Sequence, residues 1–306
     1  MRLRLVWQTA SLLIACGFAF APEVAAQKVA ITFDDLPVHG SLPAGVTRAQ
    51  VATDILAALK SSGTPPVYGF VNAVWLERNP SNGDVLALWR KAGYPLGNHT
   101  WSHMNLNEHA TAKWEADLLK NEPALEQRMH DKDWRWIRFP FLAEGAAATK
   151  TDEVRVFLSA HHYRIAGVTL SFGDYLFNEP YARCTARHDA AAVARLEGLF
   201  LDAARDDLVE RRAMAKAALG HEIPLVLLMH VGAFDAHMLP ALLTMYHGEG
   251  VQFVSLEEAE RDPFYANDVD PRRAIFPDTL EAAVAAKQVT VARRPAPTAE
   301  LDNICK

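Results

Sequence analysis

The chain has 306 residues, a formal net charge of −6, and a composition that is 50% hydrophobic and 22% charged. The hydrophobic content excludes an intrinsically disordered chain, and the acidic balance argues against a polybasic nucleic-acid binder. Three cysteines without a CxxC pair are too few for a disulfide-built scaffold and do not indicate a zinc ribbon. The length suits one large α/β domain or two smaller ones.

Residues 1–26 have the layout of a secretory signal peptide. Two early arginines precede an apolar stretch from Leu5 to Phe20, and Val24-Ala25-Ala26 supplies the small residues that a signal peptidase recognises. We therefore expect cleavage near Ala26 and an exported protein, either periplasmic or secreted. Two alternatives stay open. One is a membrane anchor, although the stretch is short for a span of roughly 20 residues. The other is a lipoprotein signal with Cys16 as the lipidated residue.

The rest of the chain alternates β-rich runs with helical patterns. Strands are predicted at Val29–Phe33, Val67–Val71, Tyr94–His99, Trp136–Pro140, Tyr163–Leu170, Pro224–His230 and Val251–Leu256. Helices are predicted at Thr47–Ser62, Asn82–Ala92, Glu108–His130, Asp152–Ala160, Arg187–Leu219, Ala236–His247 and Thr279–Lys287, with a break in the longest near Gly198. This alternation predicts parallel strands with helical crossovers, in an open sheet or a closed barrel.

No repeat or low-complexity linker divides the chain, so we expect one domain over residues 27–262. Residues 263–306 differ, because Arg272–Pro277 and Arg293–Pro297 have the pattern of irregular surface chain. We expect them to form a C-terminal tail that packs on the domain. In α/β folds of this type, ligands bind at the C-terminal ends of the strands. The residues that end each strand are therefore the candidates for function.

Five of the predicted strands end in, or lead into, side chains that can carry chemistry. These segments are Thr32–Asp35, Gly97–His103, Arg138–Phe141, Gly173–Tyr175 and Leu227–His230. His99 and His103 are four residues apart, and on a helix both imidazoles would face one direction. Two histidines and one carboxylate can hold Zn²⁺ or a similar divalent ion and leave positions open for water.

These motifs, in this order, resemble the polysaccharide deacetylase family, which has the NodB homology domain and is similar to carbohydrate esterase family 4. They appear here as Thr32–Asp35, His99–His103, Arg138–Phe141, Asp174-Tyr175 and Leu228–His230. The resemblance runs from about Val29 to Leu256. Phe141 stands where tyrosine is usual, and Tyr175 stands where tryptophan is common. The resemblance implies a deformed (β/α)7 barrel, in agreement with the seven predicted strands.

The resemblance also implies a divalent-metal-dependent hydrolase that removes acetyl groups from an N-acetylated or O-acetylated carbohydrate. Asp35, His99 and His103 would bind the metal. We expect Zn²⁺, with Co²⁺, Ni²⁺ or Mn²⁺ as alternatives, because these ligand types accept several ions. The metal would polarise the acetyl carbonyl and acidify a bound water, which attacks it. The expected partner is an acetylated glycan or oligosaccharide, without nucleic acid and without a stable protein partner.

The remaining roles are carried over residue by residue. Asp34 would be the general base, and Arg138 would pair with it and keep it ionised. His230 would be the general acid that protonates the leaving amine, oriented and held protonated by Asp174. The backbone amide of Phe141 could help to stabilise the oxyanion. The candidates for substrate contacts are Phe141, Leu228, Trp101 and Tyr175.

Two further features stand outside the motifs. Cys184 and Cys305 remain after loss of the leader, and in an oxidising compartment they would either form one disulfide or stay free thiols. Most other histidines are expected on the surface. His39 is the exception, because it follows Asp35 closely and could border the cleft.

Rival functions stay open at this point. The chain could be a carbohydrate-binding protein that keeps the fold without turnover, or a metal-dependent hydrolase of a non-sugar amide. An iron oxygenase is disfavoured, because the candidate general base and general acid would have no use there.

Overall fold

The computed structural model describes residues 26–130, 132–273, 279–293 and 295–306. The predicted leader, with Cys16, lies outside the described residues except for Ala26, and most of the irregular segment Arg272–Pro277 lies outside them as well. Across the described ranges, no helix combines the length and the apolar character that crossing a membrane requires.

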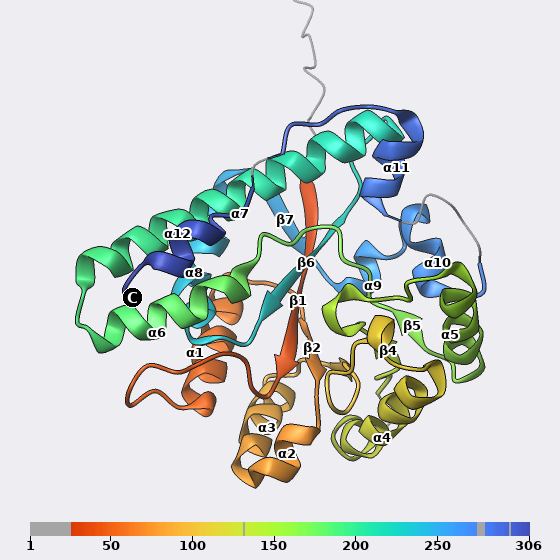
Figure 1. Cartoon of the computed structure of the whole chain (residues 1–306), viewed down its shortest axis with the longest axis horizontal. Coiled ribbons are helices and arrows are strands. Elements are labelled where there is room, and N and C mark those ends of the chain that lie inside the picture. Colours follow the sequence, from red (N-terminus) through yellow and green to blue (C-terminus); the bar gives the residue numbers. More distant parts are fainter. Residues whose placement is uncertain (1–25, 131, 274–278, 294) are drawn as a thin grey trace, which may run out of the picture.

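A parallel sheet of seven strands forms the centre of the molecule (Figure 1). The strands are β1 (Gln27–Leu36), β2 (Tyr68–Val71), β3 (Leu96–Asn98), β4 (Trp136–Ile137), β5 (Arg164–Ile165), β6 (Leu225–His230) and β7 (Val251–Val254). They lie in the order β5-β4-β3-β2-β1-β6, and β7 pairs with β1. The long strand β1 contacts β7 through Gln27–Ala30 and β2 through Thr32–Leu36, while β6 runs along its other side.

The sheet curls, and its two ends meet. Just beyond β5, Leu170 pairs in parallel with Leu227 of β6, and the Leu228 amide donates to the Leu170 carbonyl. The segment predicted as the strand Tyr163–Leu170 therefore pairs with two different strands, with β4 at its beginning and with β6 at its end. This curled sheet with its helices confirms the predicted (β/α)7-type barrel.

Helices cover the outside of the sheet (Figure 1). The longer ones are α1 (Arg48–Ser61), α3 (Gly83–Lys91), α4 (Thr111–Met129), α5 (Ala148–Ala160), α6 (Asn178–Ala186), α7 (Ala190–Leu219), α8 (Ala233–Gly248) and α11 (Leu280–Lys287). The shorter ones are α2 (Val74–Arg78), α9 (Leu256–Ala259), α10 (Ala266–Val269) and α12 (Thr298–Asn303). Short strands with apolar residues on both faces suit a parallel sheet buried in this way.

The predicted break near Gly198 is wrong, because α7 continues through it without interruption. A glycine inside a helix costs about 1 kcal/mol relative to alanine. The α7 face that holds Leu196, Phe200 and Ala204 is fully buried, and burial of this apolar face outweighs that cost.

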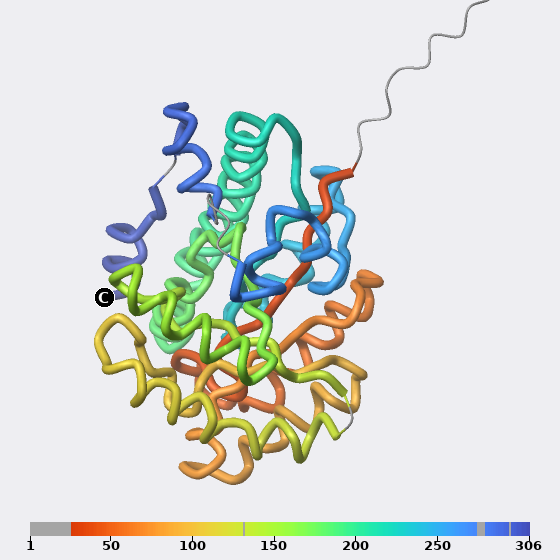
Figure 2. The backbone as a smooth tube through the Cα atoms, turned by 90° about the vertical axis from the view of Figure 1, so that its right-hand side faces the viewer, coloured from red at the N-terminus to blue at the C-terminus, as the bar shows by residue number. Residues whose placement is uncertain are grey.

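The C-terminal tail packs against α6 and α7 (Figures 1 and 2). Cys184 of α6 forms a disulfide with Cys305, with their Cα atoms 5.2 Å apart. The neighbouring Arg183 donates hydrogen bonds to the carbonyls of Leu301 and Ile304. A covalent bond and two hydrogen bonds thus hold the end of the chain to the helix that follows the Asp174 segment.

Candidate active site

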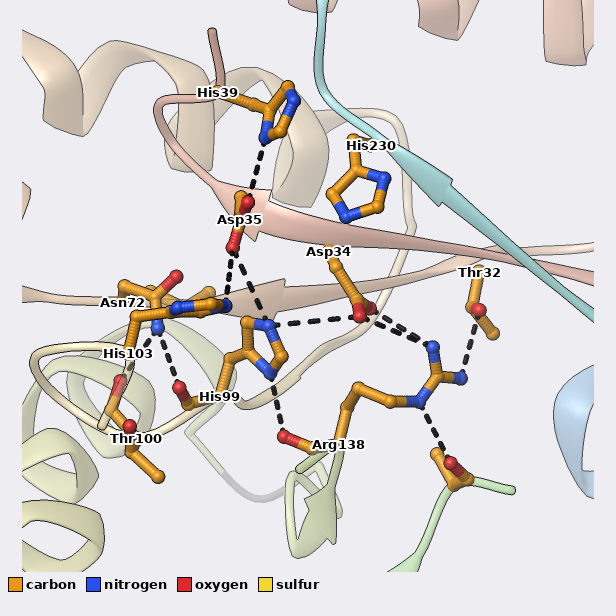
Figure 3. Close-up of polar contacts among 12 residues, drawn as sticks. Thr32, Asp34, Asp35, His39, Asn72, His99, Thr100, His103, Arg138 and His230 are labelled. Atoms are coloured by element: carbon orange, nitrogen blue, oxygen red, sulfur yellow. Dashed lines mark hydrogen bonds and ion pairs between the residues drawn. The ribbon is translucent and has the colours of Figure 1, made fainter. Parts of the chain in front are cut away.

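The C-terminal ends of β1, β3, β4 and β6 bring most of the predicted site residues to one cavity of about 450 Å³ (Figure 3). In the register of β1 and β6, Asp34 lies opposite His230. The predicted residues that line the cavity are Asp34, Asp35, His99, His103, Phe141, Tyr175, Leu228 and His230. His39 lines it as well. Three further lining residues, Phe139, Leu142 and Ser171, were not singled out in the sequence.

Three of these residues form a candidate metal centre. Asp35 Oδ1 lies 3.3 Å from His103 Nε2 and 3.5 Å from His99 Nε2, and one ligand atom from each residue lies within 4.8 Å of the others. His99 Nδ1 is 2.6 Å from the Arg138 carbonyl, so this nitrogen carries the proton and Nε2 keeps its lone pair for a metal. Burial lowers the pKa of His103 to about 4, which keeps that imidazole in the neutral form that binds metals. The donor set therefore fits a divalent ion.

His99 and His103 do not lie on a helix, so the helical geometry considered for this pair is wrong. They lie in a turn after β3, where Thr100 and His103 have positive φ angles of 58° and 60°. Asn72 Nδ2 donates to the carbonyls of His99 and Thr100, and Asn98 Oδ1 accepts from the Thr100 amide. These buried amide side chains replace the helical hydrogen bonds that the turn lacks.

The helix α4 supplies the second support of this turn. Asp117 accepts hydrogen bonds from the backbone amide and the hydroxyl of Ser102, and Asn121 Nδ2 donates to Asn98 Oδ1 and to the Val71 carbonyl. Sequence reasoning missed this network. The one available signal was Asn98, a polar residue at the end of an otherwise apolar strand, whereas nothing marks the polar positions on α4.

His39 holds the second oxygen of Asp35. Its Nδ1 lies 2.7 Å from Asp35 Oδ2, which leaves Oδ1 facing the two other histidines (Figure 3). Burial would raise the pKa of Asp35, but the hydrogen bonds of His39 and His99 outweigh it and hold this pKa well below its usual range. The ring of His39 also lies 4.5 Å from that of His230, and Asp35, His39 and His230 form a second group whose ligand atoms lie within 4.8 Å of one another.

Asp34 and Arg138 form a buried ion pair inside the barrel. Arg138 Nη1 lies 3.1 Å from Asp34 Oδ1, and both residues are at most 2% exposed. The same guanidinium donates through Nη2 to Thr32 Oγ1 and through Nε to the Ala166 carbonyl. The ion pair of Arg138 therefore does not lie on the surface. The guanidinium holds the Asp34 carboxylate toward the cavity and compensates its negative charge.

The fully buried Asp174 and the partly buried His230 form a second pair. Asp174 lies in the short 3-10 turn Asp174–Phe177, and it accepts hydrogen bonds from the backbone amide of His230 at 2.6 Å and from Nδ1 at 3.1 Å. Burial alone would lower the pKa of His230, but Asp174, with smaller contributions from Asp35 and Asp34, raises it to about 10. The imidazole is therefore cationic at neutral pH.

The predicted substrate-contact residues take different positions. Phe141 and Tyr175 are exposed at the cavity, while Leu228 is buried in its wall. Phe141 has a positive φ of 59°, and its amide donates to no acceptor among the described residues. Trp101 does not line the cavity, because its amide is bonded to the Asp117 carbonyl and the Lys120 ammonium lies 3.0 Å from the centre of its ring.

Comparison with known proteins supports the family and the fold. The family model described as polysaccharide deacetylase matches residues 21–162, which confirms the resemblance seen in the motifs. The matched segment contains both aspartates, both metal-site histidines and Arg138, whereas Asp174 and His230 lie beyond it. No curated protein matches the chain.

Solved structures share the fold. The chitin deacetylase from the fungal pathogen Colletotrichum lindemuthianum is 20% identical, with a TM-score of 0.50 over 76% of this chain and 87% of that one. A CE4 family pseudoenzyme from Bacillus anthracis is 16% identical, with a TM-score of 0.51 over 77% and 66%. A mutant of it with restored enzymatic activity is 17% identical, with a TM-score of 0.53 over 77% and 68%.

Proposed function

We propose that this chain, whose residues 21–162 match the polysaccharide deacetylase family, removes acetyl groups from a carbohydrate with the help of a divalent metal ion. The proposal rests on one observation, which is that three sets of side chains lie together at one cavity. They are the metal ligands Asp35, His99 and His103, the pair Asp34–Arg138, and the pair Asp174–His230.

The ligand set of two imidazoles and one carboxylate fits Zn²⁺ and also accepts Co²⁺, Ni²⁺ or Mn²⁺. When bound, such an ion supplies Lewis-acid polarisation of the acetyl carbonyl and acidifies water. His99 is oriented for this task by its Nδ1 contact with the Arg138 carbonyl, and Asp35 by its contact with His39. These two ligands thus have partners that fix their directions.

Proton transfer falls to the two residues that face each other across β1 and β6. Asp34 is the base that takes a proton from the attacking water, and the buried Arg138 holds its carboxylate in place through their ion pair. His230 carries a proton at neutral pH and delivers it to the leaving group, after which Asp174 still holds the neutral ring through Nδ1. The reaction requires an unprotonated base and a protonated acid, which are the roles proposed for Asp34 and His230.

The cavity mouth suits a sugar substrate. The exposed rings of Phe141 and Tyr175 offer apolar faces at the edge of the cavity, and Leu228 gives an apolar wall for the acetyl methyl group. The Phe141 amide is the proposed donor to the oxyanion. The net charge of −6 disfavours strongly anionic polymers, so a neutral acetylated glycan or oligosaccharide is the proposed substrate.

We propose that the protein acts outside the cytoplasm, in the periplasm or as a secreted protein. The layout of residues 1–26 supports this location. The disulfide between Cys184 and Cys305 supports it independently, because such bonds persist in oxidising compartments.

The test is release of acetate from chitin oligomers, peptidoglycan fragments, small acetyl esters and non-sugar acetamides, with and without a chelator. We expect release from a sugar substrate that the chelator abolishes and that added Zn²⁺ or Co²⁺ restores. Activity that survives both metal removal and the Asp35→Ala change would refute the mechanism. Glycan binding without turnover of any substrate would instead favour a non-catalytic carbohydrate-binding protein.

A further inference from the structure

A second cavity adjoins the candidate active site. Its volume is about 600 Å³, against about 450 Å³ for the active-site cavity. Both volumes lie in the range of roughly 300–1,000 Å³ that is usual for ligand pockets. Ser171 and Tyr175 line both cavities, so the two spaces meet at these residues. The second cavity therefore extends the active site toward α7 and the C-terminal tail.

The C-terminal tail forms one wall of the second cavity. Residues 295–298 of the tail line it, and so do Leu199 and Ala203 of α7. Figure 1 shows α11 and α12, which flank this part of the tail, beside α7. The tail and α7 both lie beyond residues 21–162, the segment that matches the family model. This part of the cavity is thus built by sequence outside that match.

Contacts on both sides of residues 295–298 hold this wall in place. Before it, Arg293 Nε lies 3.0 Å from Glu210 Oε1 of α7. After it, Leu301 is only 2% exposed, and the tail disulfide follows. The two prolines of the segment restrict the backbone between these anchors. A wall that is already ordered lowers the entropy cost of binding a ligand.

The loop after β5 joins the two cavities. The Ser171 amide donates to Asp207 Oδ2 at 2.7 Å, so α7 holds this loop directly. Tyr175 is 47% exposed, and the centre of its ring lies 5.3 Å from that of His230. A molecule that reaches from His230 into the second cavity therefore passes Tyr175, because this residue borders both spaces.

The lining of the second cavity suits uncharged sugar units. The ring of Tyr175 and the apolar side chains of Leu176 and Pro297 offer surfaces for the apolar faces of sugar rings. Carboxylates such as that of Asp202 accept hydrogen bonds from sugar hydroxyls. The described lining contains four carboxylates and two guanidinium groups, and this excess of negative charge disfavours anionic sugars.

We propose that the second cavity binds the sugar units next to the acetylated one, so that the substrate is an uncharged oligosaccharide or polysaccharide and the C-terminal tail is part of its binding site. The effect on turnover rests on the proposed deacetylase function, whereas glycan binding can be measured without it. Contacts with such remote units supply binding energy that raises kcat/KM. Activity therefore increases with the length of the glycan.

The discriminating variant is Ala296→Arg, which places a long side chain in the second cavity from an exposed position of the tail. In the wild type, we expect kcat/KM to rise about tenfold from a single N-acetylated sugar to its tetramer, and we expect Ala296→Arg to lose this gain. The small ester p-nitrophenyl acetate needs only the active-site cavity, so its kcat/KM should change by less than about twofold.

The matched control is Ala299→Arg, the same change at an exposed position of α12 that does not line the second cavity. It should keep the dependence on glycan length. Thermal unfolding of each variant shows whether it folds. If Ala296→Arg does not fold, Thr298→Arg replaces it, because Thr298 lines the same cavity from another exposed position.

Calorimetric titration with the same sugars in the presence of a chelator measures binding without turnover. We expect the tetramer to bind about tenfold more tightly than the single sugar in wild type and in Ala299→Arg. We expect no dependence on length in Ala296→Arg, because its new side chain occupies the space of the neighbouring sugar units.

The two measurements separate the possible failures. If acetate is released but neither kcat/KM nor affinity depends on length, the second cavity is not a glycan site and the proposed function stands. An Ala296→Arg variant that keeps the wild-type gain with length, or that loses activity equally on the ester and the tetramer, also overturns the proposal. If no acetate is released while affinity rises with length in wild type and not in Ala296→Arg, the proposed function fails and the glycan site stands. Neither release nor binding of any sugar refutes both.

Discussion

The buried pair of Arg138 and Asp34 gives the sharpest prediction on stability. The change Arg138→Met keeps an apolar chain of similar length and removes the guanidinium, which now contacts Asp34, Thr32 Oγ1 and the Ala166 carbonyl. Breaking one side of a buried ion pair typically costs about 3–5 kcal/mol, because the remaining charge stays buried without a partner. Arg138 is 1% exposed and Asp34 2%, so little solvent surrounds the pair to compensate for the lost contact.

The free energy of unfolding from urea titrations measures this cost. We expect Arg138→Met to lose about 3–5 kcal/mol, and the double variant Asp34→Asn/Arg138→Met to regain part of it, because the unpaired charge is then removed. The control is Lys28→Met, which breaks the half-exposed pair of Lys28 with Glu258 and should cost less than about 1 kcal/mol. Equal losses in Arg138→Met and Lys28→Met would refute the reasoning.

Three further predictions concern pH, metal affinity and the tail. His230 has a folded pKa of about 10 against an ordinary 6.5, so its stabilising contribution is complete below pH 6.5 and is lost as the pH rises to about 10. Urea titrations of the metal-free wild type and of His230→Gln across this range should show that the difference between their free energies of unfolding shrinks as the pH rises. The His39→Ala change frees Asp35 Oδ2 and should weaken zinc binding by about 10- to 100-fold in calorimetry; an unchanged affinity would contradict the role given to His39. Loss of the Cys184–Cys305 disulfide, which spans 121 residues, should lower the free energy of unfolding by about 2–5 kcal/mol; equal stability of oxidised and reduced protein would contradict this.

The strand positions could be predicted because each strand is a short apolar run between helical patterns. The seven predicted runs all overlap observed strands. The helix α6 was missed, since it begins with Asn178 and carries Pro180 in its first turn, where proline is tolerated although it usually marks an interruption. The continuity of α7 could not be predicted either. Burial of its apolar face outweighs the helix-destabilising effect of Gly198, and this burial is a property of the packed fold.

The grouping of candidate site residues could be predicted where those residues stand at the ends of strands. Asp34, Asp35, His99 and His103 stand at strand ends, and parallel strands must bring those ends together. Trp101 lies between the same histidines, but the positive φ at Thr100 belongs to a turn that leaves its ring beside α4 instead of in the cavity.

The residues that support the site were beyond sequence reasoning. Asn178 and Asp235 are 57 positions apart, and each is a residue type that is common near the beginning of a helix. Asp235 in particular matches the acidic residue that favours a helix N-terminus. Only the fold buries it fully and brings its carboxylate within hydrogen-bond distance of Asn178.

The metal centre is the central claim, and anomalous diffraction at the zinc absorption edge tests it most directly. Crystals of the zinc-loaded protein should show one strong peak bonded to Asp35 Oδ1, His99 Nε2 and His103 Nε2, and this peak should disappear in His103→Ala. A peak held by Asp35, His39 and His230 instead, or zinc bound only outside the cavity, would contradict the account.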